Sequence, residues 1–259
     1  MKHNQWRLIE SGLENAQWNM AVDEALLSNF KDGDLPILRL YRWEPSLSLG
    51  RFSKPKSILN IKKIAQDGFP FVRRISGGGV LVHGKDISYG LILSRDSFDN
   101  MGVKESYSYI CKFIIELYKK LGHTALFASQ TELETKKSDV CLAGIEPYDI
   151  VIKGKKIGGN AQRYSKNTLL QHGSIPISVD EAQLEPLFIK DSGLKSSTSL
   201  EKLGTAIEYN KLIELVKEAF CESFNVTLVL DRLSLEEKKS AKILLNEKYT
   251  QNRWNIHAN

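Results

Sequence analysis

Cysteine is scarce in this sequence. The three cysteines, Cys111, Cys141 and Cys221, are odd in number, widely spaced and without a CxxC pair. This pattern indicates neither a disulfide framework nor a zinc site of paired cysteines, so free thiols are expected. The five histidines also lack metal-ligand spacing such as HExxH, and no metal is expected.

Long apolar stretches are missing too. No window approaches the roughly 20 consecutive apolar residues that span a bilayer. The opening residues, MKHNQWRLIE, lack the apolar segment of a signal peptide. These absences predict a cytoplasmic protein with no membrane partner.

Concentrated positive charge is absent as well. The 36 Lys and Arg residues are scattered among 31 Asp and Glu residues, and the formal net charge is +5. No block of Lys and Arg and no stacking aromatic motif marks a nucleic-acid-binding module. Nucleic acid is therefore not an expected partner, although the net charge favours an acidic one.

A triple glycine at 77–79 lies between predicted strands 69–74 and 80–83. No GKS or GKT follows it and it is no GxGxxG opening a helix, which excludes both phosphate-binding motifs. Two interpretations stay open: a hairpin turn, or a cradle of backbone N–H groups for a carbonyl or phosphate. Adjacent strand residues point in opposite directions, so at most one of Arg73 and Arg74 should face a site here.

The chain has 259 residues, 42% of them hydrophobic, which suffices for one large domain or two small ones. Helices and mainly antiparallel strands are mixed without regular βα alternation, so we expect an α+β fold of mixed sheets flanked by helices. Asn15 is a candidate N-cap for the first helix. Further helices are expected at 58–66, 104–121, 181–188, 200–203, 210–224 and 234–248. Strands are expected at 6–9, 37–43, 87–94, 125–127, 148–153, 156–161, 169–177 and 226–230, and 47–50 is either a short strand or a turn.

Reactive side chains stand beside glycine-rich backbone in the segment 138–175. Cys141 lies outside any periodic pattern, and Lys153, Lys155 and Lys156 follow within one predicted hairpin. Nearby cations lower the pKa of a thiol and favour the nucleophilic thiolate. Cys141 is therefore the candidate nucleophile, with an incidental thiol beside a solvated lysine turn as the alternative.

The two neighbouring lysines of this hairpin should behave differently. Lys155 and Lys156 are adjacent on the returning strand, so their side chains should diverge and one of them should point inward. A lysine next to a turn has little packing to lose, so replacing Lys156 by Ala should leave the fold intact. Cys111 and Cys221 fall on apolar helix faces and are expected to be buried, inert thiols.

Two histidines are candidates for the site. His172 could act as a base for Cys141, but no Asp or Asn is identifiable as a third member, and a hydrogen-bonded structural histidine is the other interpretation. His83, just after the triple glycine, has the same two interpretations. Trp43 and Phe52 are expected in the core, with a pocket lining as the alternative.

The order of these segments resembles a known family. RRISGGGVLVHG followed by YDIVIKGKKIGGNAQRYSKNTLLQHGSI resembles the catalytic domain shared by lipoate-protein ligases, biotin-protein ligases and octanoyltransferases. WRLIESGLENAQWNMAVDEALL, SDVC, LQHGSI and EKYTQNRWN are similar, more narrowly, to the cysteine-dependent octanoyl-acyl carrier protein:protein N-octanoyltransferases. The resemblance implies one catalytic domain over 1–259, with a mostly helical part at about 181–259.

The resemblance also implies roles for residues. Cys141 would accept the acyl group from octanoyl-acyl carrier protein, and a lysine of a lipoyl domain would then attack the acyl-cysteine. The acceptors implied are the lipoyl domains of the glycine cleavage H protein or of 2-oxoacid dehydrogenase E2. Lys156 would be the second catalytic residue, at the acyl carbonyl. The expected substrate-binding residues are Arg74, Ser76, Gly77, Gly78, Gly79, His83, Gly158, Gly159, Asn160 and His172.

The sequence departs from these families at a few positions, and other activities stay open. The ATP-dependent lipoate ligases usually continue their loop through His-Asp, where this chain has His83-Gly84-Lys85-Asp86, and the octanoyltransferases often have an aromatic residue at Leu142 and Ser at Asn160. No cofactor is expected unless the protein is such a ligase, which would need ATP and Mg²⁺ for an acyl-adenylate. A lipoyl amidotransferase and a non-catalytic acyl-binding or nucleic-acid-binding module are the remaining alternatives.

Overall fold

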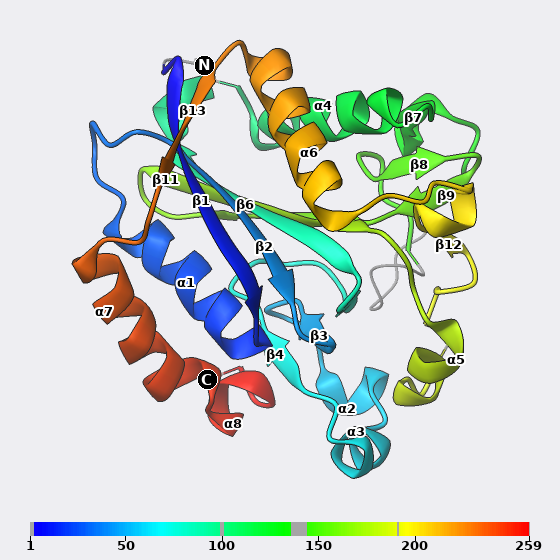
Figure 1. Cartoon of the computed structure of the whole chain (residues 1–259). Coiled ribbons are helices and arrows are strands. Elements are labelled where there is room, and N and C mark those ends of the chain that lie inside the picture. Colours follow the sequence, from blue (N-terminus) through cyan, green and yellow to red (C-terminus); the bar gives the residue numbers. More distant parts are fainter. Residues whose placement is uncertain (1–2, 99–100, 136–143, 191, 259) are drawn as a thin grey trace.

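The computed structural model describes residues 3–98, 101–135, 144–190 and 192–258. A six-stranded mixed sheet forms its centre (Figure 1). β1 pairs in parallel with β2 and β13, whereas the β2–β6, β6–β11 and β11–β10 pairs are antiparallel. In spatial order the strands are β10 (Gly159–Tyr164), β11 (Thr168–Pro176), β6 (Asp86–Ser94), β2 (Ile37–Trp43), β1 (Gln5–Glu14) and β13 (Thr227–Asp231).

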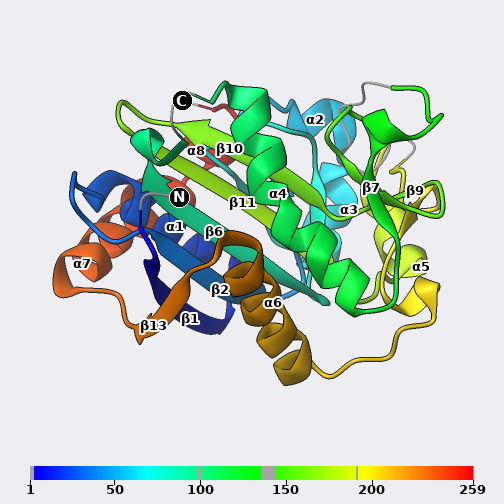
Figure 2. The ribbon, with the colours of Figure 1, turned by 90° about the horizontal axis from the view of Figure 1, so that it is seen from above.

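Helices cover both faces of this sheet (Figures 1 and 2). The helices α4 (Val103–Lys120) and α6 (Tyr209–Phe224) pack on one face, where Leu38 and Leu40 of β2 meet them. The helices α1 (Ala16–Asn29) and α7 (Leu235–Leu244) pack on the other, against Ile37 and Tyr41 of the same strand. Alternate side chains of β2 thus pack into two hydrophobic cores on opposite faces of the sheet. The expected α+β class is confirmed.

Local sequence signals account for the helix boundaries. The side chain of Asn15 accepts a hydrogen bond of 2.8 Å from the backbone N–H of Trp18, which confirms it as the N-cap of α1. The expected helix 104–121 is confirmed as α4, and Cys111 on its inner face is fully buried. Cys221 on α6 is only half-buried, so the prediction of burial was wrong for this residue.

Two smaller sheets stand beside the central one. One has the order β12 (Ser197–Thr198), β9 (Lys155–Ile157), β8 (Ile150–Ile152) and β7 (Ala125–Phe127). The other has the order β4 (Phe71–Arg73), β3 (Ser46–Leu49) and β5 (Leu81–His83). The triple glycine joins β4 to β5, which lie on opposite sides of β3 and do not pair with each other. The triple glycine therefore belongs to a connection that crosses past the end of β3, and the hairpin interpretation is wrong.

Some predicted elements are divided in the structure. The strand expected at 156–161 splits at Gly158, whose φ is +68°, into β9 and β10 of different sheets. A Cβ at Gly158 would lie 2.1 Å from the carbonyl oxygen of Ser174, so only glycine fits at this corner. The helix expected at 58–66 is two short helices, α2 (Pro55–Ile58) and α3 (Ile61–Asp67).

The C-terminal part contributes α5 (Glu181–Leu184), α6, α7, α8 (Asn252–Asn255) and the short strands β12 and β13. Because β13 extends the central sheet at β1, we infer that this part belongs to the same domain as the rest of the chain. In the part of the chain that the structure describes, no helix is long and apolar enough to cross a membrane.

Candidate active site

A cavity of about 380 Å³ lies between the triple glycine and the hairpin of β8 and β9. Its wall combines segments that are distant in sequence, since the triple glycine and residues 160–162 of β10 both line it. The lining residues are Gly77, Gly78, Gly79, Val103, Lys104, Tyr107, Gly144, Glu146, Pro147, Tyr148, Asp149, Lys156, Asn160, Ala161 and Gln162.

Lys156 reaches this cavity from β9. Lys153 and Gly154, both with positive φ, form the tight turn, after which Lys155 is exposed and Lys156 is buried. The predicted divergence of the two lysines is confirmed. The Nζ of Lys156 lies 2.6 Å from Oδ2 of Asp149 and 3.3 Å from the carbonyl oxygen of Gly144. The expectation that Lys156 has little packing to lose is wrong, because the hairpin turns this side chain into the protein.

Cys141, the predicted nucleophile, lies outside the described residues. The described chain resumes at Gly144, which lines the cavity and contacts Lys156 through its carbonyl.

Arg74 organises the triple glycine. Its guanidinium donates to the carbonyl oxygens of Gly77 and Gly79 at 3.0 and 2.9 Å, and to the carbonyl and hydroxyl oxygens of Ser48 at 2.6 and 2.8 Å. Arg73 donates instead to backbone carbonyls such as that of Trp254, so the two arginines diverge as predicted. Arg74 thus connects the backbone of the loop to Ser48 of β3, which gives it a role in shaping the loop.

In the triple-glycine loop, carbonyl oxygens have hydrogen-bond partners within the described part of the protein, whereas the backbone N–H groups do not. The carbonyls of Gly77 and Gly79 accept from Arg74, whereas among the described residues no hydrogen-bond acceptor faces the N–H of Gly77, Gly78 or Gly79. Gly50 packs directly beneath, and a Cβ there would lie 1.7 Å from the carbonyl oxygen of Gly78. This arrangement favours the cradle interpretation of the loop, with N–H groups left for a substrate oxygen.

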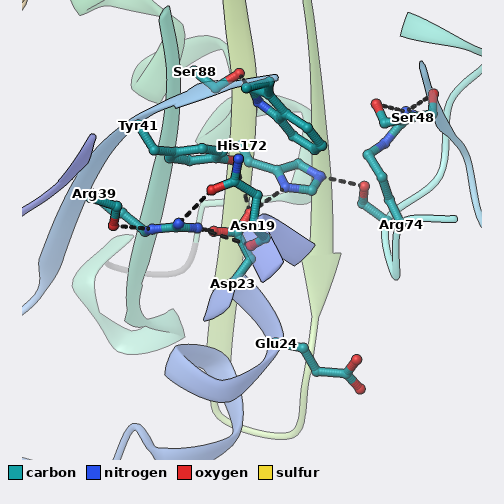
Figure 3. A network of polar contacts seen from close by, with 12 residues as sticks. Asn19, Asp23, Glu24, Arg39, Tyr41, Ser48, Arg74, Ser88 and His172 are labelled. Atoms are coloured by element: carbon teal, nitrogen blue, oxygen red, sulfur yellow. Dashed lines mark hydrogen bonds and ion pairs between the residues drawn. The ribbon is translucent and has the colours of Figure 1, made fainter. Parts of the chain in front are cut away.

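His172 is held at both ring nitrogens (Figure 3). Its Nδ1 lies 2.9 Å from Oδ2 of Asp23 on α1, and its Nε2 lies 2.5 Å from the hydroxyl of Ser76, which precedes the triple glycine. Asp23 also accepts from Arg39 at 2.6 Å and from the hydroxyl of Tyr41 at 2.9 Å. The Asp partner that the sequence did not reveal is thus 149 residues away in the chain.

The charges of this network follow from burial. Burial lowers the pKa of His172 below its usual value, despite the nearby Asp23. Burial would raise the pKa of Asp23, but Arg39 and His172 overcome it and the net pKa is lowered. A neutral His172 between an ionised Asp23 and a hydroxyl donates from Nδ1 and accepts the Ser76 proton at Nε2. His172 therefore fixes the orientation of Ser76.

His83 has an analogous environment on the other side of the loop. Its Nδ1 lies 2.9 Å from Oδ2 of Asp86 and its Nε2 lies 2.7 Å from the hydroxyl of Ser48. The ring stacks on buried Trp43 at a centroid distance of 4.0 Å. Trp43 is therefore core and also lines a small void, whereas Phe52 is 80% exposed, and its expected place in the core is wrong.

Asn160 lines the cavity and is hydrogen-bonded to the central sheet. Its Oδ1 accepts a hydrogen bond of 2.7 Å from the hydroxyl of Tyr89. A Cβ at Gly173 would lie 2.0 Å from this Oδ1, so glycine on β11 makes the room. Cys111 on α4 is fully buried, as predicted, and burial raises the pKa of its thiol to about 12, which disfavours the reactive thiolate. Gly158 and Gly159 shape the corner between β9 and β10 and do not line the 380 Å³ cavity.

No group of three or more His, Cys, Asp or Glu residues within the described ranges is placed to hold a metal ion. The polar side chains that line the cavity are two lysines, two carboxylates, two amides and two tyrosines, beside the backbone of the triple glycine. The buried ammonium of Lys156 and the loop N–H groups suit the stabilisation of an oxyanion at a carbonyl carbon.

The fold of the chain is similar to that of lipoate-protein ligases. A lipoate-protein ligase A bound with ATP matches with a TM-score of 0.86 at 22% identity, over 98% of this chain and 100% of that one. A bi-partite lipoate protein ligase from Thermoplasma acidophilum matches with a TM-score of 0.82 at 22% identity, over 99% and 98%. These likenesses confirm the predicted fold.

The chain belongs to the lipoyl protein ligase A/B catalytic domain family, whose model matches residues 15–221. Among its relatives is an octanoyltransferase LipM from Geobacillus kaustophilus, 35% identical over 97% of this chain and 98% of the relative. Proteins of the same name from Staphylococcus aureus and Bacillus subtilis are 34% and 32% identical, over 96% and 98% of this chain and 97% and 99% of theirs. The family predicted from the sequence motifs is confirmed.

Proposed function

We propose that this protein is an octanoyltransferase of lipoate biosynthesis. It takes an octanoyl group from octanoyl-acyl carrier protein onto Cys141 and passes it to a lysine of a lipoyl domain. The similarity to octanoyltransferases over nearly the whole chain supports the reaction. The bi-partite ligase of Thermoplasma acidophilum, which shares the fold, forms a lipoylation system with its E2 lipoyl domain, and this supports a lipoyl domain as the acceptor. The cytoplasmic location expected from the sequence stays a prediction.

The observation that carries the proposal is that Gly144, which follows Cys141 closely in the sequence, lies at the cavity. Cys141 lies three residues before Gly144 in the sequence, and Gly144 lines the cavity and contacts Lys156. A chain segment of this length spans at most about 11 Å. The proposed reaction requires the thiol of Cys141 to act within reach of Lys156. The ammonium of Lys156 would favour the thiolate there.

In the first step the thiolate of Cys141 attacks the thioester carbonyl carbon of the donor. The carbonyl π electrons move to oxygen, and the oxyanion is stabilised by the N–H groups of the triple glycine and by Lys156. Collapse breaks the bond to the pantetheine sulfur, which leaves as a thiolate and takes up a proton. An octanoyl-cysteine remains on the enzyme.

In the second step the neutral amine of the acceptor lysine attacks the same carbonyl carbon. The bond between carbon and the Cys141 sulfur breaks, the amide forms, and the proton lost by the amine balances the released thiolate. Thioester exchange is close to isoenergetic and the amide is more stable than the thioester. The proposed route therefore consumes no ATP.

A small second void adjoins the main cavity, and we propose that the end of the acyl chain lies beside it. It has a volume of about 20 Å³ and shares Gly78, Asn160 and Ala161 with the main cavity. Met20, Trp43 and Leu81 give it apolar walls. We place the methyl end of the octanoyl chain between Ala161 and these walls, where apolar contact favours a hydrocarbon over water.

The proposal is tested by incubating the protein with octanoyl-acyl carrier protein in the absence of ATP. Peptide mass spectrometry should find one octanoyl group on Cys141, and adding an apo lipoyl domain should remove it. Cys141→Ser should abolish the adduct, while Cys221→Ser, a matched change at a half-buried thiol, should preserve it.

Other outcomes would assign the alternative activities. If no adduct forms and the Cys141→Ser variant is fully active with ATP and free octanoate, the protein is a ligase. If only an acylated lipoyl domain serves as donor, it is an amidotransferase.

A further inference from the structure

The segment that leads from β3 into α2 and the C-terminal helix α8 lie at the same end of the molecule (Figure 1). A shallow basic hollow lies between them. Its volume is about 430 Å³, and residues 51–56 and 256–258 together with Arg73 line it. Arg51, Lys54, Lys56 and His257 are among them, and no carboxylate is. We call this surface the basic hollow.

The cations of the basic hollow have no acidic partner within the described residues. Arg51, Lys54 and Lys56 form no ion pair there, whereas Lys217 of α6 pairs with Glu214 of the same helix. Lys54 and Lys56 are exposed. The hollow therefore carries uncompensated positive charge, which attracts acidic surfaces.

An exposed aromatic ring stands among these cations. Phe52 is 80% exposed, and the guanidinium of Arg51 lies 5.9 Å from its ring centre and 5.1 Å from that of Trp254. Aromatic and Arg side chains carry a large share of the binding energy at protein interfaces. An isolated phenyl ring in water gains most from burial in a partner's apolar socket.

The fold holds this surface in place. Arg73, which is buried, donates to the carbonyl oxygens of Arg51 and Ser53 on one side, at 2.7 and 2.8 Å, and to those of Trp254 and Asn255 on the other, at 2.8 and 3.1 Å. One arginine thus fastens both segments of the hollow. A pre-formed surface loses little conformational entropy when a partner docks.

We infer that the basic hollow docks the protein donor of the acyl group: an acidic protein that carries the acyl chain on a phosphopantetheine arm and has an apolar socket for Phe52 between carboxylates. This inference rests on the proposed function. The hollow is joined to the triple glycine, since the N–H of Arg51 donates to the carbonyl oxygen of Ser76 at 2.8 Å and that of Gly50 to Gly79 at 3.2 Å.

The position of the hollow favours the donor over the acceptor. None of its lining residues lines the 380 Å³ cavity, so a docked protein is displaced from the reaction centre. A phosphopantetheine arm can bridge such a displacement. A lysine side chain is several times shorter, so the acceptor must dock at the mouth of the cavity itself.

The test compares two donors and two sets of variants. Lys54→Glu/Lys56→Glu and Phe52→Ala are measured beside Lys238→Glu/Lys239→Glu and Leu235→Ala, which change exposed residues of the same kinds on or near α7. The rate of acyl-enzyme formation at Cys141 is followed with octanoyl-acyl carrier protein and with octanoyl-pantetheine, which lacks the protein. Binding of the carrier protein is measured separately by calorimetry.

We expect the two hollow variants to raise the KM for the carrier-protein donor at least tenfold, and to leave the reaction with octanoyl-pantetheine unchanged. The wild-type KM should also rise with salt, and the α7 variants should behave as wild type. An unchanged KM, an equal loss with both donors, or a defect confined to transfer onto the lipoyl domain would overturn the inference. If wild-type protein binds the carrier protein through the hollow but forms no acyl-cysteine, the proposed function fails and the docking surface stands.

Discussion

Lys156 and Asp149 form a buried ion pair at the wall of the cavity, with Nζ and Oδ2 2.6 Å apart and side chains 4% and 8% exposed. Replacing Lys156 by Ala should lower acyl transfer at least tenfold, because the cation next to the reacting carbonyl is lost. It should also destabilise the fold by roughly 3 to 5 kcal/mol, because Asp149 would remain as a buried charge without its ammonium. Transfer assays and urea unfolding measure the two effects.

The matched control for this prediction is Lys155→Ala, on the exposed side of the same strand. It should change the free energy of unfolding by no more than about 0.5 kcal/mol and leave transfer intact. Equal behaviour of the two variants would show that Lys156 acts as an ordinary surface lysine.

Gly50→Ala should impair transfer through the shape of the triple glycine. The added methyl would lie 1.7 Å from the carbonyl oxygen of Gly78, so the loop must move. We expect a cost of about 1 to 3 kcal/mol in stability and a fall in kcat of at least tenfold. Gly102→Ala, whose methyl meets nothing closer than 3.7 Å, serves as the control. A normal kcat in Gly50→Ala would contradict a rigid cradle.

Stability should fall as the pH drops from about 6.5 to 5. The pKa of His172 is lowered in the folded state by burial. Below the unfolded pKa of about 6.5 the unfolded chain therefore binds a proton that the folded protein does not, and unfolding becomes easier by at most about 1.4 kcal/mol per pH unit. Asp23 and Asp86, whose folded pKa values are lowered, add their losses only at more acidic pH, below about 3.9.

Chemical unfolding at several pH values measures this dependence. His172→Gln keeps polar atoms near Asp23 and Ser76 but cannot titrate, so its unfolding free energy should be flatter between pH 6.5 and 5. The same slope in both proteins would assign the pH dependence to other groups.

Ala161→Leu should shift the preferred acyl chain toward shorter donors. Ala161 borders both the main cavity and the small void, and a larger side chain would occupy space beside both. We expect hexanoyl donors to gain on octanoyl donors in kcat/KM by about tenfold, a typical effect of one or two methylene groups in an apolar pocket. Competition between the two acyl-carrier proteins measures the ratio. An unchanged ratio would place the acyl chain elsewhere.

The elements of the fold that depend on neighbouring residues could be predicted from the sequence. The cap at Asn15, the buried face of α4 and the divergence of Lys155 and Lys156 all follow from contacts within a few residues or from strand alternation. The segments around Cys141, the triple glycine and Lys156 were also informative, because their glycines and reactive groups have few purely structural explanations.

The sequence by itself determined which side chains were available for chemistry, whereas the tertiary structure decided their partners. Asp23 contacts His172 of β11 only because α1 packs against the central sheet on the same side as the His172 side chain. Asp149 contacts Lys156 only because the hairpin of β8 and β9 turns the lysine side chain into the protein. The triple glycine is a crossover and not a hairpin because β3 inserts between the two strands it joins. These contacts between residues distant in sequence depend on how the helices pack on the sheets, so they cannot be predicted from a local sequence pattern.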